Sequence, residues 1–292
     1  MISEDERKVL AEAIQKNPAY RLAYEDADLM EQDDLRAMRL QLELIKPERA
    51  LRRHDVRSTV VVMGSARIVS PDRAQRQLED AQTQGNPASP KAKRQVAQAE
   101  RQVRLSRYYV EAQRFAELVS LRFQQEDRRD FVVVTGGGPG IMEAANLGAY
   151  DVGARSAGLN ITLPHEQTPN PFITPDLAFR FRYFALRKMH FLMRAKALVA
   201  FPGGFGTMDE LFEVLTLVQT GKMPKLPIVL FGPEFWTRAV DFDYLVAEGM
   251  ISPQDCQLFT LVETADQAIA ALLDFYQGQP PDAPQNEPEG VA

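Results

Sequence analysis

Residues 202–210 read PGGFGTMDE and place a carboxylate just after a glycine-rich turn, a combination that could bind a phosphate and act on the group attached to it. An apolar run precedes this turn and a helical pattern follows it. Glycines let backbone N–H groups approach a ligand closely, and the start of a helix carries partial positive charge. A second turn, residues 135–140 (TGGGPG), has the same setting. Two such turns in one sheet can face one crevice, one holding a phosphate and the other the sugar or base.

Glu210 has two interpretations. It stands three residues after Thr207 at the expected start of a helix, which is the spacing of a capping box, where the carboxylate only reaches back to the N-cap amide. Alternatively, the carboxylate points at a ribose beside the bound anion. Glycosidic cleavage passes through an oxocarbenium-like transition state that a nearby carboxylate stabilises, and the same group can position water. Spacing alone leaves both interpretations open.

Arg187 lies in an apolar, aromatic helical pattern, three residues after Phe184 and four before Phe191. Its guanidinium therefore shares a face with two aromatic rings and needs a partner, for which a phosphate or a carboxylate is the natural group. The alternative is an arginine that runs along the apolar stripe to solvent. Lys188 points elsewhere, as a surface residue or a secondary anion contact. We predict that the phosphate- and nucleotide-binding residues are Gly64, Ser65, Gly136, Gly137, Gly138, Lys188, Gly203, Gly204, Gly206 and Thr207.

Other binding chemistries lack support in the sequence. The glycine spacing is not the G-x-G-x-x-G dinucleotide fingerprint, and no G-x-x-x-x-G-K-[ST] loop occurs, so NAD and Walker-type ATP sites are disfavoured. The 3 histidines (His54, His165 and His190) are scattered, and no Cys/His cluster indicates a metal site. We therefore expect no metal and no organic cofactor.

The elements that must position these residues alternate between strand-like and helical patterns. β-Branched and apolar runs occur at 58–63, 131–135, 157–163, 197–201, 227–231 and 259–262. Helical patterns lie between or after them, at about 106–126, 140–152, 183–195, 207–220, 234–247 and 265–276. This alternation predicts a Rossmann-like α/β fold with a doubly wound, mostly parallel sheet. Ligands of such sheets bind at the carboxyl ends of the strands, where both glycine-rich turns fall.

The chain divides into three predicted regions. Residues 1–56 form an N-terminal helical extension, residues 57–276 the Rossmann-like domain, and residues 277–292 a disordered tail. A helical insertion at about 71–106 interrupts the domain, as two helical pieces around a flexible turn. Its basic second half is either a solvated helix face or a contact for an acidic partner. The polar, proline-rich loop 165–175 could form a lid over the crevice.

Bulk composition narrows the partners and the compartment. The net charge of −6 gives no basic footprint for a nucleic acid, so none is expected as a partner. A single cysteine, Cys256, fits a reducing compartment. The acidic N-terminus indicates no signal peptide, and no apolar run approaches the roughly 20 residues of a membrane-spanning helix. We therefore expect a soluble cytoplasmic protein without a membrane partner.

Taken together, these motifs resemble the Lonely Guy (LOG) family of nucleoside 5′-monophosphate phosphoribohydrolases, some of which carry the older label "lysine decarboxylase-like". Residues 202–210 match the family motif P-G-G-x-G-T-x-x-E in full, and Arg187-Lys188 match its upstream R-K pair. Residues 136–142 match the glycine run ending in G-[IL]-M, and residues 64–67 match the G-S-[AS]-R that ends the first strand. The resemblance covers about residues 57–275.

The resemblance implies a modified Rossmann fold and hydrolysis of a nucleoside 5′-monophosphate to free base and ribose 5-phosphate, with Arg187 and Glu210 as essential residues. It implies a small-molecule nucleotide as partner, no PLP or metal, and a homodimer or larger oligomer. AMP is the plainest substrate, and an N6-prenylated adenine nucleotide is the best-known one in the family. Ala185-Leu186 replace a His-Glu found in many members. The extension and the insertion lie outside the compact family core and bear on substrate choice and assembly.

Our hypothesis is that the 5′-phosphate docks on the amides of residues 203–207, that Arg187 supports the charge, and that Glu210 contacts the ribose. Three alternatives stay open. One is a non-catalytic nucleotide-binding or carrier protein on the same fold. Another is a lysine decarboxylase, which would need PLP held by a Schiff-base lysine. The third is an interaction protein that uses its N-terminal helices and its basic insertion.

Overall fold

The computed structural model describes residues 2–83, 89–125, 128–162, 168–278 and 281. The chain forms two compact units, an N-terminal unit of residues 1–46 and a C-terminal unit of residues 47–292. The helix α3 (Arg36–Arg53) runs through the division between them. The domain boundaries expected from the sequence stay predictions.

The N-terminal unit is helical. It contains α1 (Glu4–Lys16), whose N-cap Ser3 forms a capping box with Glu6, and the short α2 (Ala27–Met30). Turns of 3-10 helix at Pro18–Tyr20, Ala23–Glu25 and Asp33–Leu35 complete it. Among residues 2–46, no apolar side chain is buried within this chain. This unit therefore has no hydrophobic core of its own.

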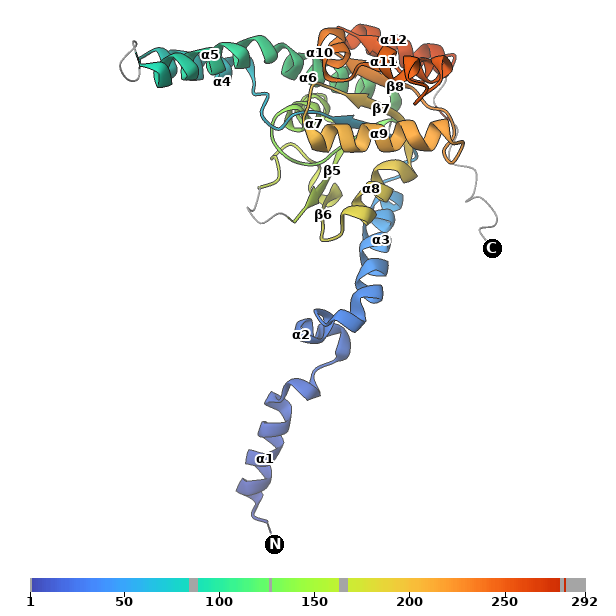
Figure 1. Cartoon of the computed structure of the whole chain (residues 1–292). Coiled ribbons are helices and arrows are strands. Elements are labelled where there is room, and N and C mark those ends of the chain that lie inside the picture. The colour runs from blue at the N-terminus through green and yellow to red at the C-terminus, as the bar shows by residue number, and fades with distance from the viewer. Residues whose placement is uncertain (1, 84–88, 126–127, 163–167, 279–280, 282–292) are drawn as a thin grey trace. The chain divides into compact units, whose positions relative to one another are not determined.

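The C-terminal unit is built on a seven-stranded, all-parallel sheet, which confirms the predicted Rossmann-like, doubly wound α/β fold (Figure 1). Its strands are β1 (Thr59–Met63), β4 (Val132–Thr135), β5 (Ser156–Ile161), β6 (Ala178–Phe181), β7 (Ala195–Ala200), β8 (Ile228–Phe231) and β9 (Thr260–Val262). They stand in the order β6-β5-β4-β1-β7-β8-β9. The central β1 is buried over its whole length, as expected for a strand covered on both faces.

The strand order locates the ligand crevice. After β1 the chain builds outward through β4, β5 and β6, then returns to place β7 on the other side of β1. The connections therefore diverge between β1 and β7, and this switch point opens a crevice at the carboxyl ends of these strands. The turns that follow β1, β4 and β7 all contain the glycines singled out in the sequence.

The helices of this unit that follow α3 are α4 (Pro71–Thr83), α5 (Pro90–Leu105), α6 (Arg107–Phe123), α7 (Ile141–Asp151), α8 (Phe184–Met193), α9 (Phe205–Gln219), α10 (Pro233–Ala239), α11 (Phe242–Ala247) and α12 (Ala265–Phe275). They flank the sheet, except for α4 and α5, which pack chiefly on each other and on α6. Apolar side chains of α6, α7 and α12 pack with those of the central strands in one buried core. The helix α8 packs against β5 and β6, and α9 packs against β7. No helix among the described residues has both the length and the apolar character needed to cross a membrane.

The structure corrects the expected elements in three places. The edge strand β6 has no counterpart in the sequence prediction, because its four residues alternate exposed and buried and show no continuous apolar run. The single helix expected at 234–247 is two helices, since Asp241 caps a new one by accepting a hydrogen bond from the Tyr244 amide at 2.9 Å. A short antiparallel pair of strands, β2 (Gln124–Gln125) and β3 (Arg128–Arg129), was also missed.

The structure describes both helices of the insertion and only part of the expected turn, lid loop and tail. The helices α4 and α5 occupy the range expected for the insertion and pack on each other, with Ser89 capping α5. Residues 84–88, where most of the turn between them was expected, lie outside the described residues. So do residues 163–167, with the first part of the expected lid loop, and all of the expected disordered tail except residues 277, 278 and 281.

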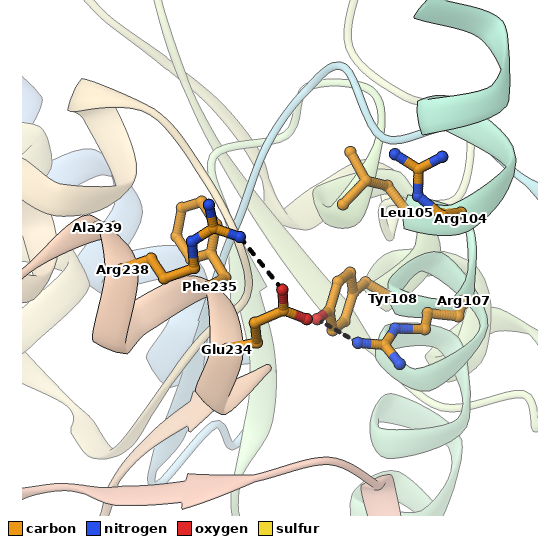
Figure 2. Close-up of a pocket in the computed structure, with 8 residues that line it drawn as sticks. All are labelled: Arg104, Leu105, Arg107, Tyr108, Glu234, Phe235, Arg238 and Ala239. Carbon is orange, nitrogen blue, oxygen red and sulfur yellow. Dashed lines mark hydrogen bonds and ion pairs between the residues drawn. The ribbon is translucent and has the colours of Figure 1, made fainter. Parts of the chain in front are cut away.

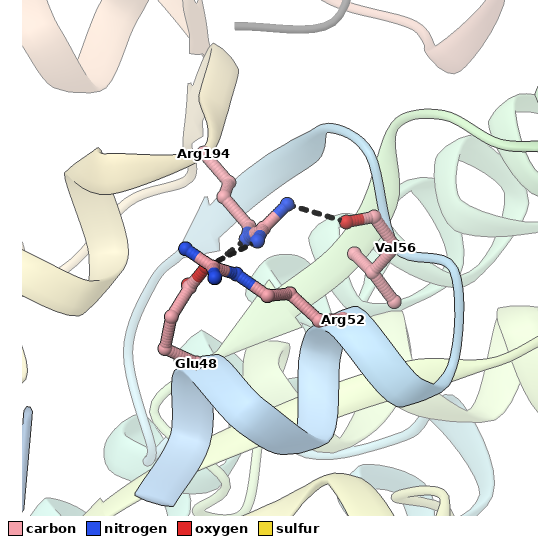
Figure 3. A network of polar contacts seen from close by, with 4 residues as sticks. All are labelled: Glu48, Arg52, Val56 and Arg194. Atoms are coloured by element: carbon pink, nitrogen blue, oxygen red, sulfur yellow. Dashed lines mark hydrogen bonds and ion pairs between the residues drawn. The ribbon is translucent and has the colours of Figure 1, made fainter. Parts of the chain in front are cut away.

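Arg194 anchors the end of α8 to the last turns of α3 (Figure 3). As the C-cap residue of α8, it donates from Nε to Glu48 Oε2 at 3.1 Å, and a second guanidinium nitrogen pairs with Glu48 Oε1. A third nitrogen donates to the Val56 carbonyl oxygen at 2.7 Å. Burial alone would raise the pKa of Glu48, but hydrogen bonds from Arg194 and Arg52 hold this pKa below its usual value. The helix that carries Arg187 is therefore fixed at its C-terminal end by a paired carboxylate.

Candidate active site

A cavity of about 770 Å³ lies at the carboxyl ends of β1 and β7, at the switch point of the sheet. The turn after β1 and the turn after β7 form two of its walls. The residues that line it are Met63, Gly64, Ser65, Ala66, Arg67, Ile68, Gln102, Leu105, Gly136, Met142, Arg187, Phe191, Pro202, Gly203, Gly204, Phe205, Gly206, Thr207, Met208, Glu210 and Phe235. The cavity thus joins segments that are far apart in the sequence.

Main-chain hydrogen bonds fix the three turns to one another. The Ser65 amide donates to the Pro202 carbonyl oxygen at 3.1 Å, and the Ile141 amide donates to the Ser65 carbonyl oxygen at 3.2 Å. Gly140 has a φ of 75°, and a Cβ at this position would lie 2.4 Å from the Ser65 oxygen. A Cβ on Gly64 would meet the Ile141 side chain at 2.6 Å. These glycines are needed for the close approach of the turns, whatever the cavity binds.

The first turn of α9 presents backbone amides to the cavity. The helix begins at Phe205 with Gly204 as N-cap, and its first internal hydrogen bond runs from the Met208 amide to the Gly204 oxygen at 3.0 Å. The amides before Met208 have no acceptor within the helix. A Cβ placed on Gly204 or Gly206 would meet no atom within 4 Å, so both glycines face open space. This geometry suits an anion, which would meet free N–H groups and the positive end of the helix.

Of the two interpretations of Glu210, the capping box with Thr207 is wrong. The N-cap is Gly204, so Thr207 is the third residue of α9 and Glu210 lies in its second turn. The Thr207 side chain instead packs over Gly203, where an added Cβ would lie 2.1 Å from its Oγ1. Glu210 therefore does not cap the start of the helix. Its burial in the cavity wall needs another explanation.

Arg187 and Glu210 form a buried ion pair in the cavity. Arg187 Nη2 lies 3.4 Å from Glu210 Oε1, and the two side chains are 15% and 4% exposed. The guanidinium also lies over the rings of Phe184 and Phe191, at 5.0 and 5.6 Å from their centroids. The sequence predicted a carboxylate or a phosphate as partner, and the carboxylate is present. Arg187 Nε and Glu210 Oε2 are buried and have no hydrogen-bond partner among the described residues.

Burial disfavours the charged form of both partners. It raises the pKa of Glu210 from its ordinary value of 4.5 to about 7, against the opposing effect of Arg187 and Lys188. The same burial lowers the pKa of Arg187, which its attraction to Glu210 partly offsets. A carboxylate with such a pKa exchanges protons readily near neutral pH, which is a property of groups used for acid–base work.

Other predicted residues lie away from the cavity. Lys188 points to the outer side of α9, where its Nζ lies 2.8 Å from Asp209 Oδ1 and 3.2 Å from Glu213 Oε2. Gly137 and Gly138 are not among the lining residues and hold the loop after β5: the Asn170 amide donates to the Gly137 oxygen at 2.9 Å, and its Nδ2 donates to the Gly138 oxygen at 3.1 Å. Of the second glycine run, only Gly136 lines the cavity.

Lining residues from two further segments had no signal in the sequence. Gln102 and Leu105 come from the inserted helix α5, and Phe235 comes from α10. Neither segment carries a motif, and only the fold brings the last turn of α5 and the first turn of α10 to the cavity. The described residues contain no group of three or more His, Cys, Asp or Glu side chains that could hold a metal ion. No lysine is among the described residues that line the cavity.

A second cavity of about 680 Å³ adjoins the first and shares Leu105 and Phe235 with it (Figure 2). In this second cavity Arg238 Nη1 lies 3.4 Å from Glu234 Oε1. Arg107 donates a hydrogen bond to the Tyr108 hydroxyl at 2.8 Å. Most of its charged side chains therefore have partners within the cavity itself.

Comparison with known proteins finds a matching family and several plant relatives. Residues 142–272 match a family described as "Possible lysine decarboxylase". The chain is 29% identical over 153 residues to the cytokinin riboside 5′-monophosphate phosphoribohydrolase LOG3 of Arabidopsis thaliana, covering 50% of this chain and 69% of that one. It is 34% identical over 91 residues to LOG1 of the same plant, covering 30% and 42%.

A solved structure with a similar outline is that of the molybdenum cofactor binding protein from the phototrophic bacterium Rippkaea orientalis. It has 16% sequence identity and a TM-score of 0.44, over 75% of this chain and 98% of that one. The family match begins at Met142 and takes in Arg187 and residues 202–210. The family model and the plant relatives together confirm the resemblance to the Lonely Guy family that the motifs indicated.

Proposed function

We propose that this protein hydrolyses the N-glycosidic bond of a nucleoside 5′-monophosphate, AMP or an N6-modified AMP, to free base and ribose 5-phosphate. The observation that carries the proposal is the buried Arg187–Glu210 pair beside the free amides of α9 in one cavity. A phosphate anchor and a carboxylate within one crevice are what cleavage of a nucleotide at its sugar requires. The names of the plant relatives support the same reaction class.

The phosphate docks at the start of α9. The amides of Phe205, Gly206 and Thr207 meet its oxygens, and the absence of side chains at Gly204 and Gly206 lets it approach the backbone. Arg67, which also lines the cavity, adds positive charge. Binding energy from this end of the substrate holds the ribose in place for the reaction at its C1′ carbon.

Glu210 acts at the sugar. Its Oε1 is held by Arg187, while its buried Oε2 is free to accept a hydrogen bond from a ribose hydroxyl or from the attacking water. As the bond to the base breaks, positive charge develops on the ribose ring, and the ionised carboxylate stabilises it. Arg187, itself held between two aromatic rings, fixes the orientation of the carboxylate.

A decarboxylase dependent on PLP is disfavoured by the residues in place. That cofactor is held through a Schiff base to a lysine. Lys188, the lysine next to the cavity wall, is engaged by Asp209 and Glu213 on the outer side of α9. The older family label therefore finds no support in the described lining residues.

We propose a homodimer or larger assembly as the working form. Phe205 lines the cavity and is 93% exposed, and with Met208 and Phe212 it also lines a shallow hollow on the outer side of α9. A large aromatic side chain left in solvent at the rim of a site marks a surface that another chain covers. The single cysteine supports our proposal of a cytoplasmic location, because disulfides rarely form in a reducing compartment.

Incubation with AMP, GMP, CMP, UMP and an N6-prenylated AMP tests the function. We expect release of free base and ribose 5-phosphate in equal amounts from at least one adenine nucleotide. Tight AMP binding, measured by calorimetry, without release of base would instead support the non-catalytic carrier on the same fold.

A further inference from the structure

Gln102 carries the next inference, because a residue of the cavity lining holds a buried acceptor without a partner among the described residues. It lies in the last turn of the inserted helix α5, and its Oε1 is buried without a hydrogen-bond partner among the described residues. Its side chain lines the same cavity as Arg187 and Glu210. A buried carbonyl oxygen that accepts no hydrogen bond is costly in a folded protein, so a hydrogen-bond donor from a ligand is its natural partner.

The surroundings of Gln102 suit a planar ring. Leu105 follows three residues later on α5 and therefore shares its helix face, and Phe235 contributes an aromatic side chain from α10. Phe235 packs edge-to-face on the fully buried Trp236, with ring centroids 5.1 Å apart, so its position is fixed. An apolar and aromatic wall beside one amide group is a typical arrangement for holding a base and contacting its edge.

The backbone at Gln102 is also held in place. The main-chain carbonyl oxygen of Gln102 accepts a hydrogen bond from the Ser106 amide at 2.9 Å, at the junction where α5 meets α6. Ser106 in turn donates from its hydroxyl to the Val103 oxygen at 2.8 Å. The side-chain amide therefore projects from a helix end that Ser106 holds through two hydrogen bonds.

The chemistry of the amide excludes the phosphate end of the substrate as the partner of Oε1. Phosphate oxygens are acceptors, and so is Oε1, so the two repel each other. A purine that carries an amino group at C6 offers an N–H donor with a ring-nitrogen acceptor beside it. A glutamine amide matches this pair with its own acceptor and donor, as it does when proteins recognise adenine.

We propose that Gln102 is a specificity-determining residue, which accepts a hydrogen bond from the N–H at C6 of an aminopurine nucleotide. This inference rests on the proposed function. It assigns a role to the insertion, which would add a base-reading residue to the crevice from outside the compact family core. An N6-alkylated adenine keeps one N–H and remains a partner, whereas a purine without the amino group does not.

The test compares two substrates in two enzymes. We would measure kcat/KM for AMP and for purine ribonucleoside 5′-monophosphate, which has hydrogen in place of the amino group, with the wild type and with Gln102→Met. Methionine has nearly the same length and offers no amide. We expect the substitution to lower kcat/KM about 5- to 30-fold for AMP and less than twofold for the purine nucleotide. Because each substrate is compared with itself, differences in intrinsic reactivity cancel.

An equal loss on both nucleotides, or no loss on AMP, would overturn the proposal, since it would mean that Gln102 supports the ribose or only the packing. Gln98→Met is the matched control, because Gln98 is an exposed residue one turn earlier on α5 and does not line the cavity. This control should leave both values unchanged.

A binding measurement separates this proposal from the proposed function. If the wild type hydrolyses neither nucleotide, the function fails. Dissociation constants of AMP and the purine nucleotide, measured by calorimetry for the wild type and Gln102→Met, still test the contact to the base. The same selective loss for AMP is expected there, and its absence would count against Gln102 in either case.

Discussion

Arg187 Nη2 and Glu210 Oε1 lie 3.4 Å apart inside the cavity, on two different helices that the fold brings together. Each partner keeps one buried polar atom without a hydrogen bond among the described residues. A buried ion pair that leaves atoms unsatisfied is a poor source of stability, because desolvation offsets its attraction. The pair is therefore better explained by the ligand that completes it.

The pKa of Glu210, raised by burial to about 7, predicts the pH dependence of the reaction. If the ionised carboxylate is the active form, kcat/KM rises about tenfold per pH unit below this value and levels off above it. The phosphate of AMP also titrates near pH 6. The residual activity of Glu210→Gln provides the control, because it keeps only the titration of the substrate. A wild-type profile that is flat from pH 5 to 8 would contradict this assignment.

The same pKa predicts a pH-dependent stability. The folded protein binds the Glu210 proton more tightly than the unfolded chain, whose value is near 4.5, so stability is full below that pH and falls as pH rises through about 7. Glutamine does not titrate. The free energy of unfolding of Glu210→Gln, relative to the wild type, should therefore increase by about 3 kcal/mol between pH 4.5 and pH 8. Urea unfolding at both values measures it, and a constant difference would mean that Glu210 has an ordinary pKa.

Gly206→Ala separates binding from stability. Gly206 lies in the first turn of α9 and faces open space, so alanine fits and should stabilise the helix by about 0.5–1 kcal/mol. Its methyl group would occupy the place of the phosphate, and we expect at least a roughly tenfold weaker Kd for AMP, equivalent to about 1.4 kcal/mol. Thr216→Ala, at an exposed position of the same helix, is the control and should not change Kd. Unchanged AMP binding by Gly206→Ala would place the phosphate elsewhere.

Glu48 should contribute much more than Arg52 to the free energy of unfolding. Glu48→Gln leaves the guanidinium of Arg194, which is 13% exposed, without its charge partner, and should cost about 3 kcal/mol in the free energy of unfolding at pH 7. Arg52 is 72% exposed, so Arg52→Gln should cost less than about 1 kcal/mol. Because the folded pKa of Glu48 is lowered, its contribution is present above the unfolded value and is lost as pH falls through the folded one. Equal effects of the two substitutions would show that Arg194 is not an anchor.

The sequence predicted the features of this site that depend on neighbours along the chain, and it missed those that depend on contacts between distant segments. The glycine turns and the strand pattern were readable, because backbone geometry and apolar runs are local properties. Arg187 was recognised from its spacing on an aromatic helix face. For Glu210 the sequence left two interpretations open, and the capping box is excluded because the helix begins at Phe205 and not after Thr207. Lys188 was expected near the ligand but pairs with two carboxylates of α9.

Gln102 was missed for a different reason. It lies in a glutamine- and arginine-rich helix whose composition indicates a solvated surface. Only the fold brings the last turn of α5, with Gln102, to the cavity. Long-range contacts of this kind leave no periodic or local signal in a single sequence.

Product analysis of AMP with the wild type and with Glu210→Gln, both shown by calorimetry to bind AMP, tests the proposed hydrolysis. The wild type should release adenine and ribose 5-phosphate in equal amounts, and Glu210→Gln should bind AMP but release them at least about 100-fold more slowly. Equal rates for both proteins, or AMP binding by the wild type with no adenine released, would contradict it.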